Sequence, residues 1–169
     1  VYDAPFSYSS KADIKKLKVG YTKSDFGGEY GFKKFDSVLI HQLQVAGVEL
    51  IQIDLPDFPV GDISFLLSAE AAAAFDDLTR SNQDDLLTRQ IKNAWPNVFR
   101  AARFIPAVEY INANRARTLL IEDMAKVMNQ VDVYLSPSWA GKNLLLTNLT
   151  GHPSVVIPNG FTQSGTPVS

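Results

Sequence analysis

The sequence has no cysteine and only two histidines among its 169 residues. The absence of cysteine excludes disulfide bridges and zinc sites built on thiolates, and it fits the cytoplasm and the periplasm equally well, so the compartment stays open. No stretch approaches the ~18 consecutive apolar residues that a membrane-spanning helix needs. The sequence therefore predicts a protein without a membrane-spanning helix and without a structural metal site of the thiolate kind.

An excess of positive charge is also missing. Sixteen Lys and Arg face eighteen Asp and Glu, which gives a net charge of −2 and a pI near 5.6. Proteins that bind nucleic acid or anionic membranes carry a basic face, so we expect neither partner. The composition, 46% hydrophobic and 20% charged, is typical of a globular protein. The length predicts one domain, a single α/β unit over residues 1–169.

The first part of the sequence alternates between strand and helix patterns. Apolar residues alternate over Leu17–Tyr21, which predicts a short strand, and a glycine-rich loop follows at Ser24–Phe32. Helical spacing over Lys33–Ala46 ends at Gly47, and VELIQIDLP then predicts a second strand. A strand, helix and strand at this spacing indicate a βαβ unit with parallel strands.

The middle of the chain is mostly helical. LLSAEAAAAFDDL is rich in strong helix formers, whereas Gln83–Trp95 fits an irregular helix or a loop. Pro106 suits the start of a long helix that runs to about Val131, followed by a strand in VDVYLSPS and a short helix in LLLTNLT that Gly151 caps. The fold class is therefore α/β, with a mixed, mostly parallel sheet flanked by helices.

A last strand is predicted near the C-terminus. The apolar triplet Val155-Val156-Ile157 lies between turn-forming residues, with Pro153 before it and Pro158 after it. A strand that is wet on one side alternates apolar and polar residues, and this triplet does not. We therefore expect a strand that is covered on both faces.

Arg117 interrupts an apolar stripe of the long helix. The stripe consists of residues that share one face at 3.6 residues per turn: Tyr110, Ala113, Leu120, Ile121, Met124, Met128 and Val131. A buried guanidinium needs a carboxylate or several carbonyl oxygens. A structural Arg with such a partner is the favoured interpretation, and an Arg that reaches a substrate pocket is the alternative.

No familiar catalytic or cofactor-binding motif is present. Gly27, Gly28 and Gly31 fit neither of the two phosphate-binding loop patterns, and no G-x-S-x-G elbow offers His152 a serine to activate. His41 is predicted to be an ordinary, partly buried helix residue. The residues themselves therefore predict no catalytic centre, no metal site and no cofactor.

Several runs in the second half, together with the front end, resemble the C-terminal part of the amidase signature family. A long helix with Arg-Thr-Leu-Leu at Arg117–Leu120 precedes a strand with Asp-Val and a Ser-Pro end at Val131–Pro137. An Asn-Leu-x-Gly-x-Pro turn then leads into an apolar run ending in Pro-x-Gly, at Asn148–Gly160. KLKVGYTK and Gly47–Ile51 resemble strands that follow the catalytic core of the family.

The resemblance implies the fold and the function. It implies the C-terminal portion of the amidase signature fold, in a fragment of a larger, bacterial-type amidase that lacks the N-terminal catalytic half and the extreme C-terminus. The family uses a Lys and two Ser residues upstream of this region, so no catalytic residue carries over, and the segment is not catalytic by itself. It would form part of the sheet and of the pocket for a small-molecule amide. The implied pocket residues are Arg100, Arg103, Arg117, Asn143, Asn148 and His152.

The chain departs from the family pattern at His152, which stands where the family commonly has Leu. A severed half of such a protein would also expose apolar surface and self-associate through it.

The alternative is an autonomous α/β module without enzymatic activity that binds a small ligand at Asp25–Gly31. Such a module would be a compact monomer.

Overall fold

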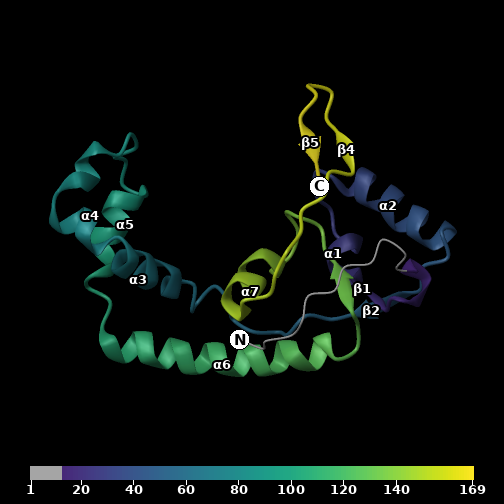
Figure 1. Cartoon of the computed structure of the whole chain (residues 1–169), viewed down its shortest axis with the longest axis horizontal. Coiled ribbons are helices and arrows are strands. Elements are labelled where there is room, and N and C mark those ends of the chain that lie inside the picture. The colour runs from purple at the N-terminus through teal and green to yellow at the C-terminus, as the bar shows by residue number, and fades with distance from the viewer. Residues whose placement is uncertain (1–12) are drawn as a thin grey trace. The chain divides into compact units, whose positions relative to one another are not determined.

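A computed structural model describes residues 13–169, which form two compact units (Figure 1). The first unit contains the chain up to Leu55, together with Lys126–Gly141 and Val155–Ser169. The second unit contains Pro56–Ala125 and Lys142–Ser154. That both belong to one α/β unit stays a prediction.

The first unit contains a parallel three-stranded sheet. Its strands are β1 (Val19–Thr22), β2 (Leu50–Ile53) and β3 (Val133–Leu135), in the order β2-β1-β3. Val19 of the central strand lies opposite Leu50 on one side and Val133 on the other. Helix α2 (Lys33–Val45) connects β1 to β2, and Gly47 follows it with a φ of +82°, a conformation that favours glycine. The predicted βαβ unit is confirmed.

The glycine-rich loop is shorter than predicted. Its first residues belong to α1 (Lys23–Gly27), which directly follows β1, and a short 3-10 turn, η1 (Ile14–Lys16), precedes that strand. The rings of Tyr21 and Phe26 lie 6.4 Å apart and brace α1 against β1. The packing of Phe26 on Tyr21 therefore accompanies a short helix where the glycines predicted a loop.

The predicted C-terminal strand is wrong for the described chain. Val155, Val156 and Ile157 form no strand, and they are 84%, 70% and 70% exposed. Within residues 13–169, no strand pairs with these three residues, so they have no neighbouring strands to form a sheet with. A short antiparallel hairpin follows instead, from β4 (Gly160–Phe161) to β5 (Pro167–Val168), with Val168 buried.

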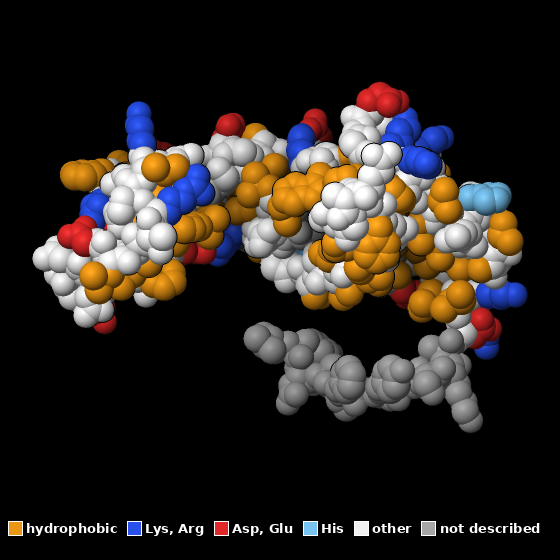
Figure 2. Space-filling view, turned by 90° about the horizontal axis from the view of Figure 1, so that it is seen from above, with side chains coloured by type: hydrophobic (Ala, Val, Ile, Leu, Met, Phe, Trp, Pro, Cys, Tyr) orange, Lys and Arg blue, Asp and Glu red, His pale blue; other side chains and the backbone are white. Residues whose placement is uncertain are grey.

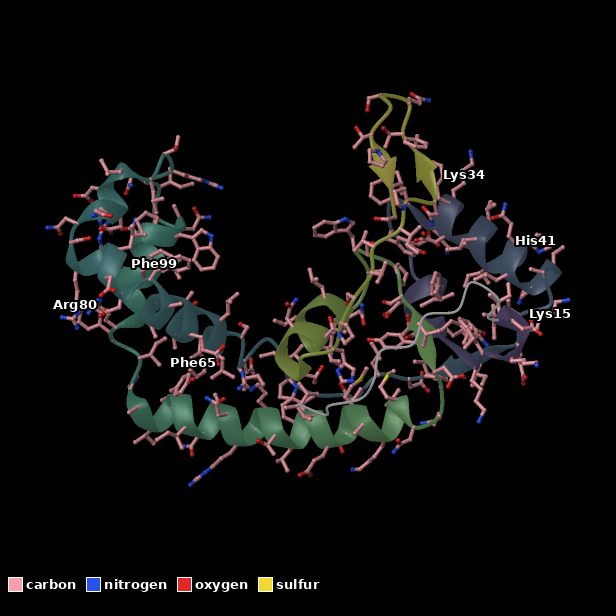
Figure 3. The ribbon with its side chains drawn as sticks, in the orientation of Figure 1. Lys15, Lys34, His41, Phe65, Arg80 and Phe99 are labelled. Carbon is pink, nitrogen blue, oxygen red and sulfur yellow. The ribbon has the colours of Figure 1, made fainter. Side chains whose placement is uncertain are left out.

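The second unit is helical. Its elements are α3 (Phe65–Ala74), α4 (Asp76–Arg80), η2 (Gln83–Leu86), α5 (Trp95–Ala102), α6 (Ala107–Met128, in this unit to Ala125) and α7 (Asn143–Thr150). Helix α3 packs on α5 around a small core of Ala72, Phe99 and Ala102. The Phe99 ring, labelled in Figure 3, belongs to this core. It stacks with both Phe75 and Trp95, with centroids 5.1 and 5.5 Å apart.

Two predictions for this unit change in detail. The run Gln83–Trp95 is a 3-10 turn followed by irregular chain, and the helix α5 that begins at its end was not predicted. The predicted long helix is confirmed as α6, where Ala113, Leu120 and Met124 are buried but Ile121 is exposed. Among the described helices, none has an apolar stretch long enough to cross a membrane.

Candidate functional site

All six residues that the sequence pointed to lie in the second unit. They fall into three places: helix α7 with the turn after it, the contact of α6 with α3, and the junction of α4, η2 and α5. Each place is held together by its own set of hydrogen bonds and ion pairs.

Helix α7 is anchored by buried residues and ends in a tight turn. Leu146, Thr147 and Leu149 are buried, and the helix stops at Gly151, whose φ of +75° lies in the left-handed region. The backbone N–H groups of Gly151 and His152 both donate to the carbonyl of Thr147, the latter at 3.1 Å. This glycine-dependent turn fixes the direction in which the chain leaves the helix.

His152 is held by a side chain of the same helix. Its Nδ1 lies 2.8 Å from Oγ1 of Thr150, whose hydroxyl also lies 2.9 Å from the carbonyl oxygen of Leu146. His152 is half-buried, so the ring is fixed without being removed from solvent. The imidazole is therefore positioned both by the backbone turn and by one hydroxyl.

The two asparagines lie on the same helix with different surroundings. Asn148 is exposed, and its Nδ2 donates to the carbonyl of Leu144 at 2.7 Å. Asn143 begins the helix and is half-buried, and its carbonyl accepts from the Thr147 hydroxyl at 2.9 Å. Just before it, Lys142 Nζ lies 3.0 Å from Oδ1 of Asp57, which ties the helix start to the chain after β2.

Arg117 pairs with a carboxylate of helix α3. Its Nη1 lies 3.1 Å from Oε1 of Glu70, and the Tyr110 hydroxyl donates to the same oxygen at 3.5 Å. The guanidinium is half-buried and its charge is matched. The contact joins α6 to α3, whereas the role of Arg117 toward a substrate stays a prediction.

Arg100 and Arg103 hold the α4–η2–α5 junction together. Arg100 Nη2 lies 2.5 Å from Oδ2 of Asp84 and 2.7 Å from Oδ1 of Asp85. Arg103 pairs with Asp76, which also pairs with Arg80. The contact with Arg80, and then the charge of Arg103, hold the pKa of the Asp76 carboxyl below its usual range. Both arginines are thus engaged with carboxylates, and their predicted role facing the substrate remains untested.

The described side chains do not assemble a metal centre. No group of three or more His, Cys, Asp or Glu residues within residues 13–169 is close enough to hold a metal ion. The single histidine of the first unit, His41, is exposed on α2 rather than partly buried as predicted (Figure 3). What the second unit offers chemically is hydrogen-bonding groups on a rigid turn and charged groups that are already paired.

Sequence reasoning missed a buried polar group in the first unit. Asp36 is 3% exposed and is the one buried residue of α2, and its Oδ1 accepts a 2.6 Å hydrogen bond from Nδ2 of Asn159. Burial, and then the neighbouring Asp36, raises the pKa of Tyr30 well above its usual range. Burial, and then Asp25, raises the pKa of Tyr134 to about 12. No local signal marks this group, because Asp36 lies among polar residues of α2 such as Lys33, Lys34 and Ser37.

Apolar side chains are exposed on both units. Figure 2 shows hydrophobic side chains on the face it presents. In the first unit, Val45, Trp139 and the Val155–Ile157 triplet are exposed, and in the second Phe104 and Leu86 are. Scattered apolar residues are normal on protein surfaces, but three consecutive ones on an unpaired segment are the kind of surface that a partner covers.

Known proteins resemble most of the chain. The A subunit of the glutamyl-tRNA(Gln) amidotransferase of Trichormus variabilis is 28% identical over 211 residues, which covers 95% of this chain and 42% of that protein. The corresponding protein of Corynebacterium glutamicum is 26% identical over 155 residues, with 76% of this chain and 31% of that protein covered. No protein-family model matches.

A solved structure shares the fold. The S177A variant of allophanate hydrolase from Kluyveromyces lactis matches with a TM-score of 0.65 at 16% sequence identity. The match covers 91% of this chain and 28% of the hydrolase. The chain thus spans about two fifths of the length of the Trichormus amidotransferase protein and a smaller share of the hydrolase.

Proposed function

The chain is a homologue of part of the amidase signature proteins, and on that premise we propose that it is the C-terminal segment of an amide-bond hydrolase. The observation that carries the proposal is the match of 95% of this chain to 42% of the Trichormus amidotransferase protein. In the complete protein, the segment supplies part of the sheet and part of the pocket wall. It contributes no catalytic residue.

The chemistry of the proposed reaction needs groups from outside this segment. An upstream serine forms an acyl-enzyme with the substrate and expels the amine, and a second serine and a neutral lysine move the proton. Water or another amine then resolves the ester.

The pocket wall in this proposal is helix α7 with the turn that follows it. Asn143, Asn148 and His152 lie on one short helix and its turn, and the buried leucines of α7 make that helix a rigid support. Arg117 is proposed to support the pocket from α6 through its pair with Glu70. Arg100 and Arg103 are proposed to face substrate only in part, because carboxylates already hold them. The substrate is a small-molecule amide, with no role for nucleic acid or membrane.

The exposed triplet Val155–Ile157 supports the view that the segment needs the rest of its protein. Three adjacent apolar residues outside any strand favour the addition of a neighbouring strand. In isolation, the same surface would drive self-association. The exposure weighs against an autonomous ligand-binding module, which would cover its own apolar segments.

Activity-based labelling tests the proposal. The protein encoded by the complete reading frame and the isolated residues 1–169 are each assayed for ammonia release from a panel of primary amides and then treated with a fluorophosphonate, which labels activated serines. We expect turnover and labelling only in the complete protein, with the labelled peptide outside residues 1–169. Amide hydrolysis by the isolated chain, or a label on one of its serines, would overturn the proposal.

A further inference from the structure

The hydroxyl proton of Thr150 can be assigned from its surroundings. Oγ1 of Thr150 lies 2.9 Å from the carbonyl oxygen of Leu146 and 3.4 Å from that of Thr147. A carbonyl oxygen can only accept, and a hydroxyl has a single proton, so this proton points toward a carbonyl, as in other threonines that bond back along a helix. The remaining partner of the hydroxyl must then be a donor.

That remaining partner is the Nδ1 of His152, at 2.8 Å. With the Thr150 proton on a carbonyl, the oxygen offers only lone pairs to this contact, and Nδ1 is then the donor. In a neutral imidazole only one nitrogen is protonated, so Nε2 keeps its lone pair and is a hydrogen-bond acceptor. The helix thereby fixes the tautomer of the ring.

The position of the ring is fixed as well. The N–H of His152 donates to the Thr147 carbonyl, and Pro153 restricts the backbone of the residue before it. The side chain is half-buried, so rotation about its bonds is limited while one edge stays accessible. Among the described residues, the hydrogen bond of this ring is the one at Nδ1, and no partner of Nε2 is found.

We propose that His152 determines substrate specificity by presenting Nε2 as an acceptor in the pocket wall, so that the enzyme favours amides whose acyl group carries an N–H donor. The inference rests on the proposed function, because it is the amidase pocket that would bring an acyl group to the end of α7. A leucine at this turn would offer apolar contact alone and would favour a plain aliphatic acyl group. An acceptor that must be desolvated disfavours an apolar acyl group, because its hydrogen bond to water is lost without replacement.

The tautomer is tested first, on the complete protein labelled with ¹⁵N-histidine. Long-range ¹H–¹⁵N spectra assign which ring nitrogen is protonated, and the His152→Asn variant identifies the signals. We expect a protonated Nδ1 and an unprotonated Nε2 in the neutral ring. Thr150→Val removes the acceptor and should shift the ring toward the Nε2-protonated form. The matched control is Thr118→Val, which removes the same type of back-bonded hydroxyl from α6. An Nε2-protonated ring in the unmodified protein would overturn the inference.

The specificity is tested with a pair of substrates, succinamide and N,N-dimethylsuccinamide, which differ in the remote N–H donor. Rates are compared per primary amide, because succinamide has two such groups and the dimethyl compound has one. We expect the complete enzyme to prefer succinamide by about tenfold in kcat/KM, the value of one neutral hydrogen bond. His152→Gln, whose Oε1 can replace Nε2, should keep most of the preference. His152→Asn and His152→Leu should abolish it.

The outcomes separate the two proposals. An enzyme that hydrolyses other amides but does not distinguish the pair, rejects both compounds, or keeps its preference in His152→Leu, contradicts the role of His152 and leaves the amidase proposal standing. A complete protein that hydrolyses no amide contradicts the proposed function and with it the specificity. The nitrogen spectra then still report whether Thr150 fixes the ring.

Discussion

Replacing Arg100 by methionine distinguishes a structural arginine from one that faces substrate. Arg100 Nη2 lies 2.5 Å from Asp84, whose side chain is 1% exposed, while the Arg100 side chain is 42% exposed. Arg100→Met keeps most of the aliphatic stem and removes the charge, so the carboxylate of Asp84 is left buried without its cation. That carboxylate is the reason to expect a large effect.

The magnitude follows from the burial of the two partners. Removing one partner of a fully buried ion pair typically costs about 3–5 kcal/mol, and exposed pairs contribute at most about 1 kcal/mol. Because the guanidinium is partly exposed, we expect a loss of about 2–3 kcal/mol from the free energy of unfolding. With a urea m-value of about 2 kcal/mol/M, the midpoint of unfolding should fall by roughly 1 M. The exposed pair between Arg100 and Asp85 adds little to this.

The assay follows the second unit through Trp95. Trp139→Phe removes the other tryptophan, which is exposed in the first unit, so that fluorescence in urea then reports on the stack of Trp95 with Phe99. Asp84→Asn and the double variant complete a mutant cycle, in which the double variant should be less destabilised than the sum of the single ones. Arg80→Met is the matched control, since its pair with Asp76 is an exposed contact within one helix, and its midpoint should lie within the scatter of repeated melts.

Two results would refute this reasoning. An Arg100→Met protein with the midpoint of the Arg80→Met control would show that the buried carboxylate does not depend on Arg100. Additive effects in the cycle would show that Asp84 and Arg100 do not interact. If, in addition, the complete enzyme lost substrate affinity while its stability stayed unchanged, Arg100 would face substrate.

Two further predictions concern the first unit. Burial, and then Asp25, raises the pKa of Tyr134 to about 12, above the usual value of about 10. Between these two values the folded protein keeps a proton that the unfolded chain loses. The free energy of unfolding should therefore fall as pH rises from about 10 to about 12. In urea melts across this pH range, the free energy of unfolding of Tyr134→Phe should fall less than that of the unmodified protein. An identical fall would contradict the raised pKa of Tyr134. The second prediction is that the isolated residues 1–169 self-associate on size-exclusion chromatography and bind a hydrophobic dye, and that Val156→Lys reduces both. A compact monomer without dye binding would contradict the proposed dependence on the rest of the protein.

The elements that the sequence predicted well are those whose pattern is local. The helix α2 and its stop at Gly47 follow from spacing and from the need for a positive φ, and the long helix α6 follows from Pro106 at its start and from an apolar stripe at helical spacing. Parallel pairing of β1 with β2 follows because a helix connects them. Helix α5 escaped prediction because it has only eight residues and directly follows irregular chain, although its buried residues Pro96, Phe99 and Ala102 recur at every third position.

The candidate site was less accessible to sequence reasoning, because its contacts join residues that are far apart. The family resemblance pointed to Arg100 and Arg117, yet nothing local indicates that their partners are Asp84 and Glu70. The contact of Thr150 with His152, by contrast, spans two residues. It was missed because a turn after a helix suits histidine without any function, and only the competing contact with the Leu146 carbonyl reveals the tautomer.

The apolar triplet Val155–Ile157 and the helix α2 both leave apolar side chains exposed. Sequence patterning predicts what a segment needs to bury, and it does not say which chain provides the cover. Val155–Ile157 has the pattern of a fully covered strand and is exposed, while α2 buries Asp36 and leaves Val38 and Val45 more than half exposed. Both segments lie in the unit that contains the parallel sheet. If a segment from the rest of the protein covers them, their exposure and the 42% coverage of the amidotransferase relative have one common explanation. Substitutions in Val155–Ile157 or at Val38 and Val45 should then weaken assembly of the complete protein more than they lower the stability of this unit.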